Sequence, residues 1–213
     1  IDACVEAEPA ITNEAIRQSI GRLRKEIDLD YLKGDILDLM NESREGIERV
    51  RKIVQDLKDF SHVDASTEWQ WSDLHRGLES TLNIVNNEIK YKADVVREFG
   101  ELPQIQCMPS QLNQVFMNLF VNAAHAMKEG IRGCITVRTG ATNDQVWIEV
   151  SDTGSGMTPE VMQRIFDPFF TTKPIGKGTG LGLSLAYGIV KKHNGRIEAC
   201  STPGEGTTFR ITL

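Results

Sequence analysis

The sequence lacks long hydrophobic runs. None of its apolar stretches approaches the ~20 residues that a membrane-spanning helix needs. Residues 1–9 are acidic, whereas a secretory signal is basic and then apolar. The chain starts at Ile1 rather than at a methionine, so we expect a fragment of a longer protein, and any membrane anchor would lie outside these 213 residues.

An excess of positive charge is also missing. The chain has 24 lysine and arginine residues against 30 aspartate and glutamate residues, which gives a formal net charge of −6. Proteins that bind nucleic acid generally present a basic patch. The charge balance therefore argues against nucleic acid as a partner.

Cysteine pairs are absent from the sequence. No two cysteines stand in a C-x-x-C arrangement, so neither a zinc site nor a redox motif is predicted. Unpaired cysteines favour a reducing, cytoplasmic setting. The four are Cys4, Cys107, Cys134 and Cys200.

The first third of the chain carries a heptad-like pattern of mostly apolar residues, spaced alternately by four and three. A shorter helical pattern precedes it, and residues 28–34 read as a break between two helices. A seam this narrow needs a partner, so we predict a helical dimerisation segment over residues 1–64. A helix packed only within the monomer is the alternative. The seam comprises Ile36, Met40, Ser43, Ile47, Val50, Val54 and Leu57.

Residues 65–213 are predicted to form a second domain, which follows a polar stretch over 61–67. Apolar residues recur there with helical spacing in some segments and alternate in others. Three helices are expected: one with Asp73 or Ser72 as its N-cap, one beginning at Pro109 and Ser110, and one over 183–192. Strands are expected over 93–99 and 146–152, and a hairpin over 196–213.

Two asparagines mark one face of the predicted second helix. Asn118 and Asn122 are four residues apart, and Gln114 lies one turn earlier. A single asparagine within a helix is often only a surface residue, because its amide competes with the backbone. Three amides on one face instead indicate a polar groove.

A carboxylate ends the strand over 146–152. Asp152 is followed by Gly154 and Gly156, which would let the backbone take positive φ and approach a ligand closely, and by Met157. This arrangement favours a recognition loop over a plain Asp-x-Gly turn.

The glycine run over 176–182 fits neither a Walker A loop nor G-x-G-x-x-G. It opens a helix instead, and the free backbone N–H groups at a helix start can hold phosphates. The residues involved are Gly178, Thr179, Gly180, Leu181 and Gly182.

In this order, the asparagine helix, the Asp152 loop, the glycine run and Gly204–Phe209 resemble the ATP-binding catalytic domain of sensor histidine kinases, within the GHKL ATPase group. The resemblance covers Trp69 to Leu213 and extends more weakly toward the N-terminus. It implies an α+β fold: a two-layer α/β sandwich with a mixed, mostly antiparallel sheet, preceded by the helical dimerisation segment.

The resemblance further implies ATP and Mg²⁺ as ligands. Asp152 would accept a hydrogen bond from the amino group of adenine, and Thr207 would touch the same base. Asn122 would coordinate Mg²⁺ through its amide oxygen, and Asn118, the second residue of the predicted catalytic pair, would face the phosphates. His125 would reach a phosphate, or else be a partly solvated helix residue.

Residues 166–173 resemble the phenylalanine box of the family, which anchors a mobile lid; here the lid would span 171–179, and Lys173 would reach the phosphates. The complete set predicted to bind ATP is Asn118, Asn122, His125, Asp152, Gly154, Gly156, Met157, Lys173, Gly178, Thr179, Gly180, Leu181, Gly182 and Thr207.

The phosphate-accepting histidine is not evident in this chain. Residues 51–61 resemble the second helix of the kinase dimerisation hairpin, whereas the acceptor usually lies in a His-Glu-x-x-Asn-Pro motif on the first, and that motif is absent. We therefore expect the acceptor upstream of Ile1. His62 is disfavoured, because Val63 rather than an acidic residue follows it.

These features predict a sensor histidine kinase core of a two-component system, acting as a homodimer and relaying the phosphoryl group to the aspartate of a response-regulator receiver domain. Two alternatives remain. GHKL hydrolases place a glutamate base at the position of Asn118, and an amide cannot take a proton. A non-catalytic nucleotide-sensing module would keep Asn122 and Asp152 without turnover.

Overall fold

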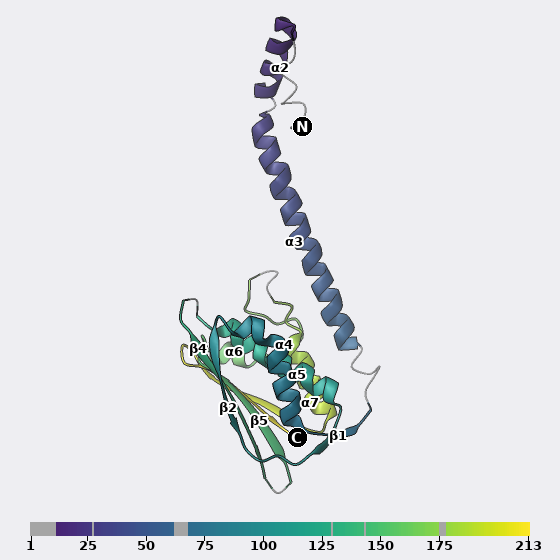
Figure 1. The fold of residues 1–213 in the computed structure, drawn as a ribbon, viewed down its shortest axis with the longest axis vertical. Coiled ribbons are helices and arrows are strands. Elements are labelled where there is room, and N and C mark those ends of the chain that lie inside the picture. The colour runs from purple at the N-terminus through teal and green to yellow at the C-terminus, as the bar shows by residue number, and fades with distance from the viewer. Residues whose placement is uncertain (1–11, 27, 62–67, 129, 143, 175–177) are drawn as a thin grey trace. The chain divides into compact units, whose positions relative to one another are not determined.

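A computed structural model describes residues 12–26, 28–61, 68–128, 130–142, 144–174 and 178–213 (Figure 1). The chain divides into two compact units, residues 1–51 and 52–213. The predicted domain boundary at 64 and 65 falls within residues 62–67, which lie outside the described residues, as does His62.

Where the structure describes it, the N-terminal segment contains two helices: α2 spans Glu14–Glu26 and α3 spans Leu29–Ser61. The predicted break over residues 28–34 is too long, because α3 runs through Lys33 and Gly34. One glycine costs about 1 kcal/mol in a helix, which a helix of 33 residues tolerates. The helical path is interrupted near Asp28, which has a positive φ of 45° and accepts a hydrogen bond from the Tyr31 N–H at 3.4 Å.

The apolar seam of α3 is solvent-exposed where its side chains are described. Ile36, Met40, Ile47 and Val50 are between 48% and 69% exposed. The side chains of Val54 and Leu57 lie outside the described residues. Within the described part of the chain, no helix combines the length and apolar character needed to cross a membrane.

The second unit is built on a five-stranded sheet of order β2-β4-β5-β7-β6 (Figure 1). The pair β2–β4 is parallel and the three other pairs are antiparallel, as the predicted mixed sheet requires. The strands are β2 (Ala93–Phe99), β4 (Gly133–Ala141), β5 (Val146–Asp152), β6 (Arg196–Thr202) and β7 (Gly206–Thr212).

Helices cover one face of this sheet (Figure 1). They are α4 (Leu74–Ile89), α5 (Pro109–Ala126) and α7 (Gly182–Lys192); a single turn, α6 (Pro159–Met162), and a small ribbon of β1 (Gln70–Ser72) with β3 (Ile105–Cys107) complete the unit. The predicted two-layer α+β sandwich is confirmed. Asp73 caps α4 as expected, accepting the His75 N–H at 2.9 Å.

The core lies between the helices and the inner face of the sheet. Burial alternates along β5, where Val146, Ile148 and Val150 point inward, and this period of two is what the sequence pattern predicts. Phe116 and Phe120 of α5 are fully buried against them. Burial of one such aromatic side chain stabilises a fold by roughly 1.5–3 kcal/mol.

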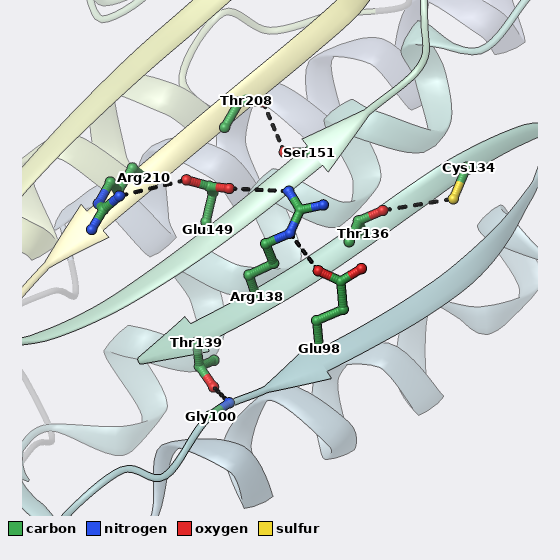
Figure 2. Close-up of polar contacts among 10 residues, drawn as sticks. All are labelled: Glu98, Gly100, Cys134, Thr136, Arg138, Thr139, Glu149, Ser151, Thr208 and Arg210. Carbon is green, nitrogen blue, oxygen red and sulfur yellow. Dashed lines mark hydrogen bonds and ion pairs between the residues drawn. The ribbon is translucent and has the colours of Figure 1, made fainter. Parts of the chain in front are cut away.

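The outer face of the sheet carries a row of alternating charges, shown in Figure 2. Glu98, Arg138, Glu149 and Arg210 stand opposite one another on four successive strands. Arg138 contacts Glu98 at 2.5 Å and Glu149 at 3.3 Å, and Arg210 lies 3.7 Å from the other oxygen of Glu149. Glu149 is therefore the central acceptor of the row, and its side chain is only 18% exposed.

Glu149→Gln should lower the free energy of unfolding by about 1 kcal/mol, the upper end of the range for partly exposed pairs, because it weakens contacts to two arginines. Glu98→Gln is the matched control, since Glu98 has one arginine partner and a half-exposed side chain; its loss should be no more than about 0.5 kcal/mol. Urea denaturation at low and high salt measures both. Equal losses of stability in the two variants would contradict the central role of Glu149 in the row of charges. So would a loss in Glu149→Gln that is as large at high salt as at low salt.

Candidate functional site

A cavity of about 510 Å³ lies between α5, the ends of β5 and β7, and the segment that leads into α7. All but one of the residues predicted to bind ATP line it. They are Asn118, Asn122, His125, Asp152, Gly156, Met157, Lys173, Gly178, Thr179, Gly180, Leu181, Gly182 and Thr207. Four motifs that are far apart in the sequence thus meet around one space.

Gly154 is the exception: it is buried behind the cavity, where its N–H donates to Asp152 Oδ1 at 2.8 Å. The expected positive φ is wrong for this residue and holds only for Gly156, at +65°. A Cβ on Gly154 would meet the Ala126 carbonyl oxygen at 2.6 Å, and one on Gly156 would collide with the Thr202 carbonyl. Both glycines are therefore required by packing of the loop against neighbouring backbone.

The buried carboxylate of Asp152 ends β5 beside Thr207, its partner in register on β7. Burial raises the pKa of Asp152, and the backbone N–H groups of Gly154 and Thr207 partly offset that rise. The side chain is 8% exposed and faces the cavity, so it presents an acceptor where little water competes.

Asn118 ties the amide face of α5 to the first residue of α7. Its Nδ2 donates to the Gly182 carbonyl oxygen at 3.0 Å. A Cβ on Gly182 would lie 3.3 Å from Asn118 Oδ1, which leaves little room for a larger residue. The asparagine helix and the glycine run, both predicted to face the phosphates, are thus joined by a direct hydrogen bond.

Lys173 reaches across the cavity to α5. Its ammonium lies 3.3 Å from Asn122 Oδ1 and 3.0 Å from His125 Nδ1. On the far side of the ring, His125 Nε2 is 3.7 Å from the carboxylate of Glu88 on α4. Glu88 is not part of the predicted site, since no local pattern marks an exposed glutamate on α4 as its neighbour.

The phenylalanine box joins the segment before α7 to the glycine run. The Phe169 N–H donates to the Gly180 carbonyl oxygen at 3.0 Å, and both residues have positive φ, 66° and 69°. A Cβ on Gly180 would collide with the backbone of Phe169. Phe166 packs on Tyr187 of α7, with ring centroids 5.4 Å apart, whereas Phe169 is 64% exposed. Residues 175–177 of the predicted lid lie outside the described residues.

Apolar side chains that the sequence did not single out form part of the cavity wall. Met117 and Val121 are four residues apart on α5, next to the amides, so their spacing could have predicted that they share the cavity face of the helix. The rest come from separate elements that only the fold brings together. They are Val161, Ile165, Leu183 and Leu185. Phe170 and Phe209, which belong to predicted motifs, also line the cavity.

The residues present suit a magnesium ion bound largely by a nucleotide. Among the described residues, no cluster of three or more His, Cys, Asp or Glu side chains could hold a metal. Mg²⁺ is usually held by one or two protein oxygens together with phosphates and water. Asn122 Oδ1, an uncharged hard ligand at the cavity surface, fits that requirement.

Comparison with known proteins points in one direction. Residues 107–213, half of the chain, match the family model described as histidine kinase-, DNA gyrase B- and HSP90-like ATPase. The sensor kinase CckA of Brucella abortus is 38% identical over an alignment of 194 residues that covers 83% of this chain and 20% of that protein. The histidine-protein kinase AtoS of Escherichia coli is 37% identical over 170 residues, 78% of this chain and 27% of that protein.

Solved structures agree with the fold. The catalytic domain of histidine kinase ThkA, nucleotide-free, has a TM-score of 0.61 and 26% identity and covers 68% of this chain and 95% of that one. Full-length ShkA in complex with AMPPNP has a TM-score of 0.68 at 23% identity, over 80% of this chain and 36% of that one. The chain spans only about a fifth to a quarter of the length of the two curated relatives.

Asp152→Asn should raise the free energy of unfolding at neutral pH. Because burial raises the pKa of Asp152 above its ordinary value of 3.8, its contribution to stability is full below that value and is lost as the pH rises through the folded-state pKa. An amide keeps the acceptor oxygen without the buried charge. The gain over the unsubstituted protein should therefore shrink as the pH falls.

Asp94→Asn is the matched control with the opposite sign. A hydrogen bond from Arg132, 2.6 Å away, lowers the pKa of Asp94 on the surface, so removal of that charge should destabilise the fold at neutral pH. Urea denaturation from acidic to neutral pH measures both variants. A loss of stability in Asp152→Asn at neutral pH would show that the charge is better solvated than its burial indicates.

Proposed function

Because this chain belongs to the family of histidine kinase-, DNA gyrase B- and HSP90-like ATPases, we propose that it is the ATP-binding core of a sensor histidine kinase. In this proposal it binds ATP with Mg²⁺ and transfers the γ-phosphoryl group to a histidine. The bond from the γ-phosphorus to the β,γ-bridging oxygen breaks, a phosphorus–nitrogen bond forms at the imidazole, and ADP leaves. The phosphohistidine then passes the group to an aspartate of a response-regulator receiver domain.

One observation supports this function above others: a single cavity joins an acceptor for the base to amides and a helix start for the phosphates. Asp152 takes the adenine amino group and Thr207 contacts the same base. The N–H groups that open α7 hold the phosphates, helped by the helix dipole. Such a site works by positioning and charge neutralisation, which is what phosphoryl transfer chiefly needs.

Asn122 is the proposed magnesium ligand, with the remaining positions filled by phosphate and water oxygens. When bound, the metal would neutralise charge on the transferring phosphoryl group. Lys173 now contacts the same amide oxygen, at 3.3 Å. A magnesium ion on that oxygen would repel the ammonium group, so Lys173 would leave Asn122 and turn to the phosphates when metal and nucleotide enter.

Transfer is favoured over hydrolysis because of the side chain at position 118. Asn118 donates its amide to Gly182 and has no basic group with which to activate water. The hydrolysing members that this chain resembles have a glutamate there. A nucleotide-sensing module without turnover is the second candidate, since the same cavity would also serve binding alone.

The partners follow from the relatives, which are sensor kinases, and from α3. The exposed seam of α3 suits a homodimer formed through the predicted segment 1–64. Cys107, Cys134 and Cys200 are free thiols, which supports a reducing, cytoplasmic setting for this part of the protein. The acceptor histidine is proposed to lie upstream of this chain rather than at His62.

Asn122→Ala should lower ATP affinity in the presence of Mg²⁺ by about 10- to 100-fold or more. Substitution of residues that only hydrogen-bond to a metal ligand already has effects of that size. ATP affinity without Mg²⁺ should not fall. Calorimetric titration with and without Mg²⁺ measures both. Asn87→Ala, an exposed helical asparagine of α4, is the control for the substitution itself. Unchanged magnesium dependence in Asn122→Ala would refute the metal assignment.

Phosphotransfer is tested with γ-labelled ATP and Mg²⁺ on this chain and on a version extended upstream in its natural sequence. Acid-labile label should appear only in the extended protein, and Asn122→Ala should abolish it. Label in the present chain that disappears in His62→Ala would contradict the upstream acceptor. Bound ATP with no label in either protein would favour the nucleotide-sensing module.

A further inference from the structure

Ser201 lies directly behind one wall of the cavity. It stands opposite Thr207 in the β6–β7 register, and its hydroxyl is 2.9 Å from the Thr207 hydroxyl. Thr207 lines the cavity beside Asp152, whereas Ser201 does not line it. Any effect of Ser201 on a bound base must therefore act through its neighbours that line the cavity, Thr207 and Met157; of these two, only Thr207 has a side-chain proton for Ser201 to orient.

The hydrogen-bond partners of Ser201 fix the direction of that contact. The Met157 N–H donates to Ser201 Oγ at 2.9 Å, and the Gly206 carbonyl oxygen lies 2.8 Å from the same atom. A hydroxyl has one proton, and a carbonyl oxygen cannot donate. All three short contacts are hydrogen bonds only if Ser201 donates to Gly206 and accepts from both Met157 and Thr207.

In that arrangement the Thr207 hydroxyl donates its proton to Ser201 Oγ. Thr207 then offers only lone pairs to the cavity, as the ionised carboxylate of Asp152 does. Two neighbouring acceptors suit a base that presents a donor, such as the 6-amino group of adenine. If both side chains face the substituent at position 6 rather than N1, they oppose a 6-oxopurine, because its O6 is itself an acceptor and would find no proton on either side chain.

We propose that Ser201 is a specificity-determining positioning residue, which holds the Thr207 proton away from the cavity and so selects adenine over 6-oxopurine nucleotides. This inference rests on the proposed ATP site. Asp152 alone attracts the amino group. Ser201 adds discrimination against 6-oxopurines. Without it, Thr207 could turn its proton toward O6 and donate a hydrogen bond to the wrong base.

The test compares ATP with inosine triphosphate, which carries O6 in place of the amino group. Both are titrated into the whole chain, with Mg²⁺, for the unsubstituted protein and for Ser201→Ala. The affinity for inosine triphosphate relative to ATP should rise roughly three- to tenfold in Ser201→Ala, the effect of one neutral hydrogen bond. Because each ratio is measured within one variant, a general loss of stability cancels.

Ser151→Ala is the matched control. Ser151 and Thr208 form the same kind of cross-strand hydroxyl pair, 2.7 Å apart, on the outer face of the sheet away from the cavity (Figure 2). The nucleotide ratio should not change in this variant. An equal change in both serine variants would mean that loss of a sheet hydroxyl, rather than orientation of Thr207, is responsible, and would overturn the proposal.

Thr207→Val completes a double-mutant cycle, because it removes the hydroxyl that Ser201 is proposed to orient. In that background Ser201→Ala should leave the nucleotide ratio unchanged. The proposal is refuted if Ser201→Ala alone does not alter the ratio, or alters it by the same factor in the Thr207→Val background. Failure of the unsubstituted chain to bind ATP would instead overturn the proposed function, and this inference with it.

Discussion

The second unit depends above all on the burial of one side of α5. Phe116 and Phe120 are completely buried, and α5 packs against both α4 and α7. Each buried phenylalanine contributes roughly 1.5–3 kcal/mol, whereas an asparagine costs a helix at most about 0.7 kcal/mol. Packing therefore easily holds Asn118 and Asn122 in helical conformation, and it fixes the direction in which their amides face the cavity.

The glycine run is held from two sides, and each hold explains a residue type. Asn118 bonds the Gly182 carbonyl from α5, and the backbone of Phe169 pairs with Gly180, where a side chain would collide. Gly180 also has a left-handed φ that favours glycine. These two contacts fix the start of α7 where the phosphates are proposed to bind. The buried Asp152, where the base is proposed to bind, lines the same cavity.

Much of this site could be predicted from sequence because its signals are local. The i, i+4 spacing of Asn118 and Asn122 and the carboxylate at a strand end require no tertiary information. Glu88 and Ser201 could not be found in that way, since their positions depend on how α4 meets α5 and on the β6–β7 register. The break over 28–34 was overestimated because glycine is locally unfavourable in a helix, whereas the long helix α3 accommodates both Gly34 and Gly46.

The order of the sheet has a consequence for self-association. Strands β2 and β6 are its outermost strands, and such edges invite other chains to add a strand. Both strands carry charged side chains, including Asp94 and Glu98 on β2 and Arg196 and Glu198 on β6. These charges disfavour edge-to-edge aggregation of the sheet. They leave self-association to surfaces of another kind, such as the exposed apolar seam of α3 through which a homodimer is proposed above.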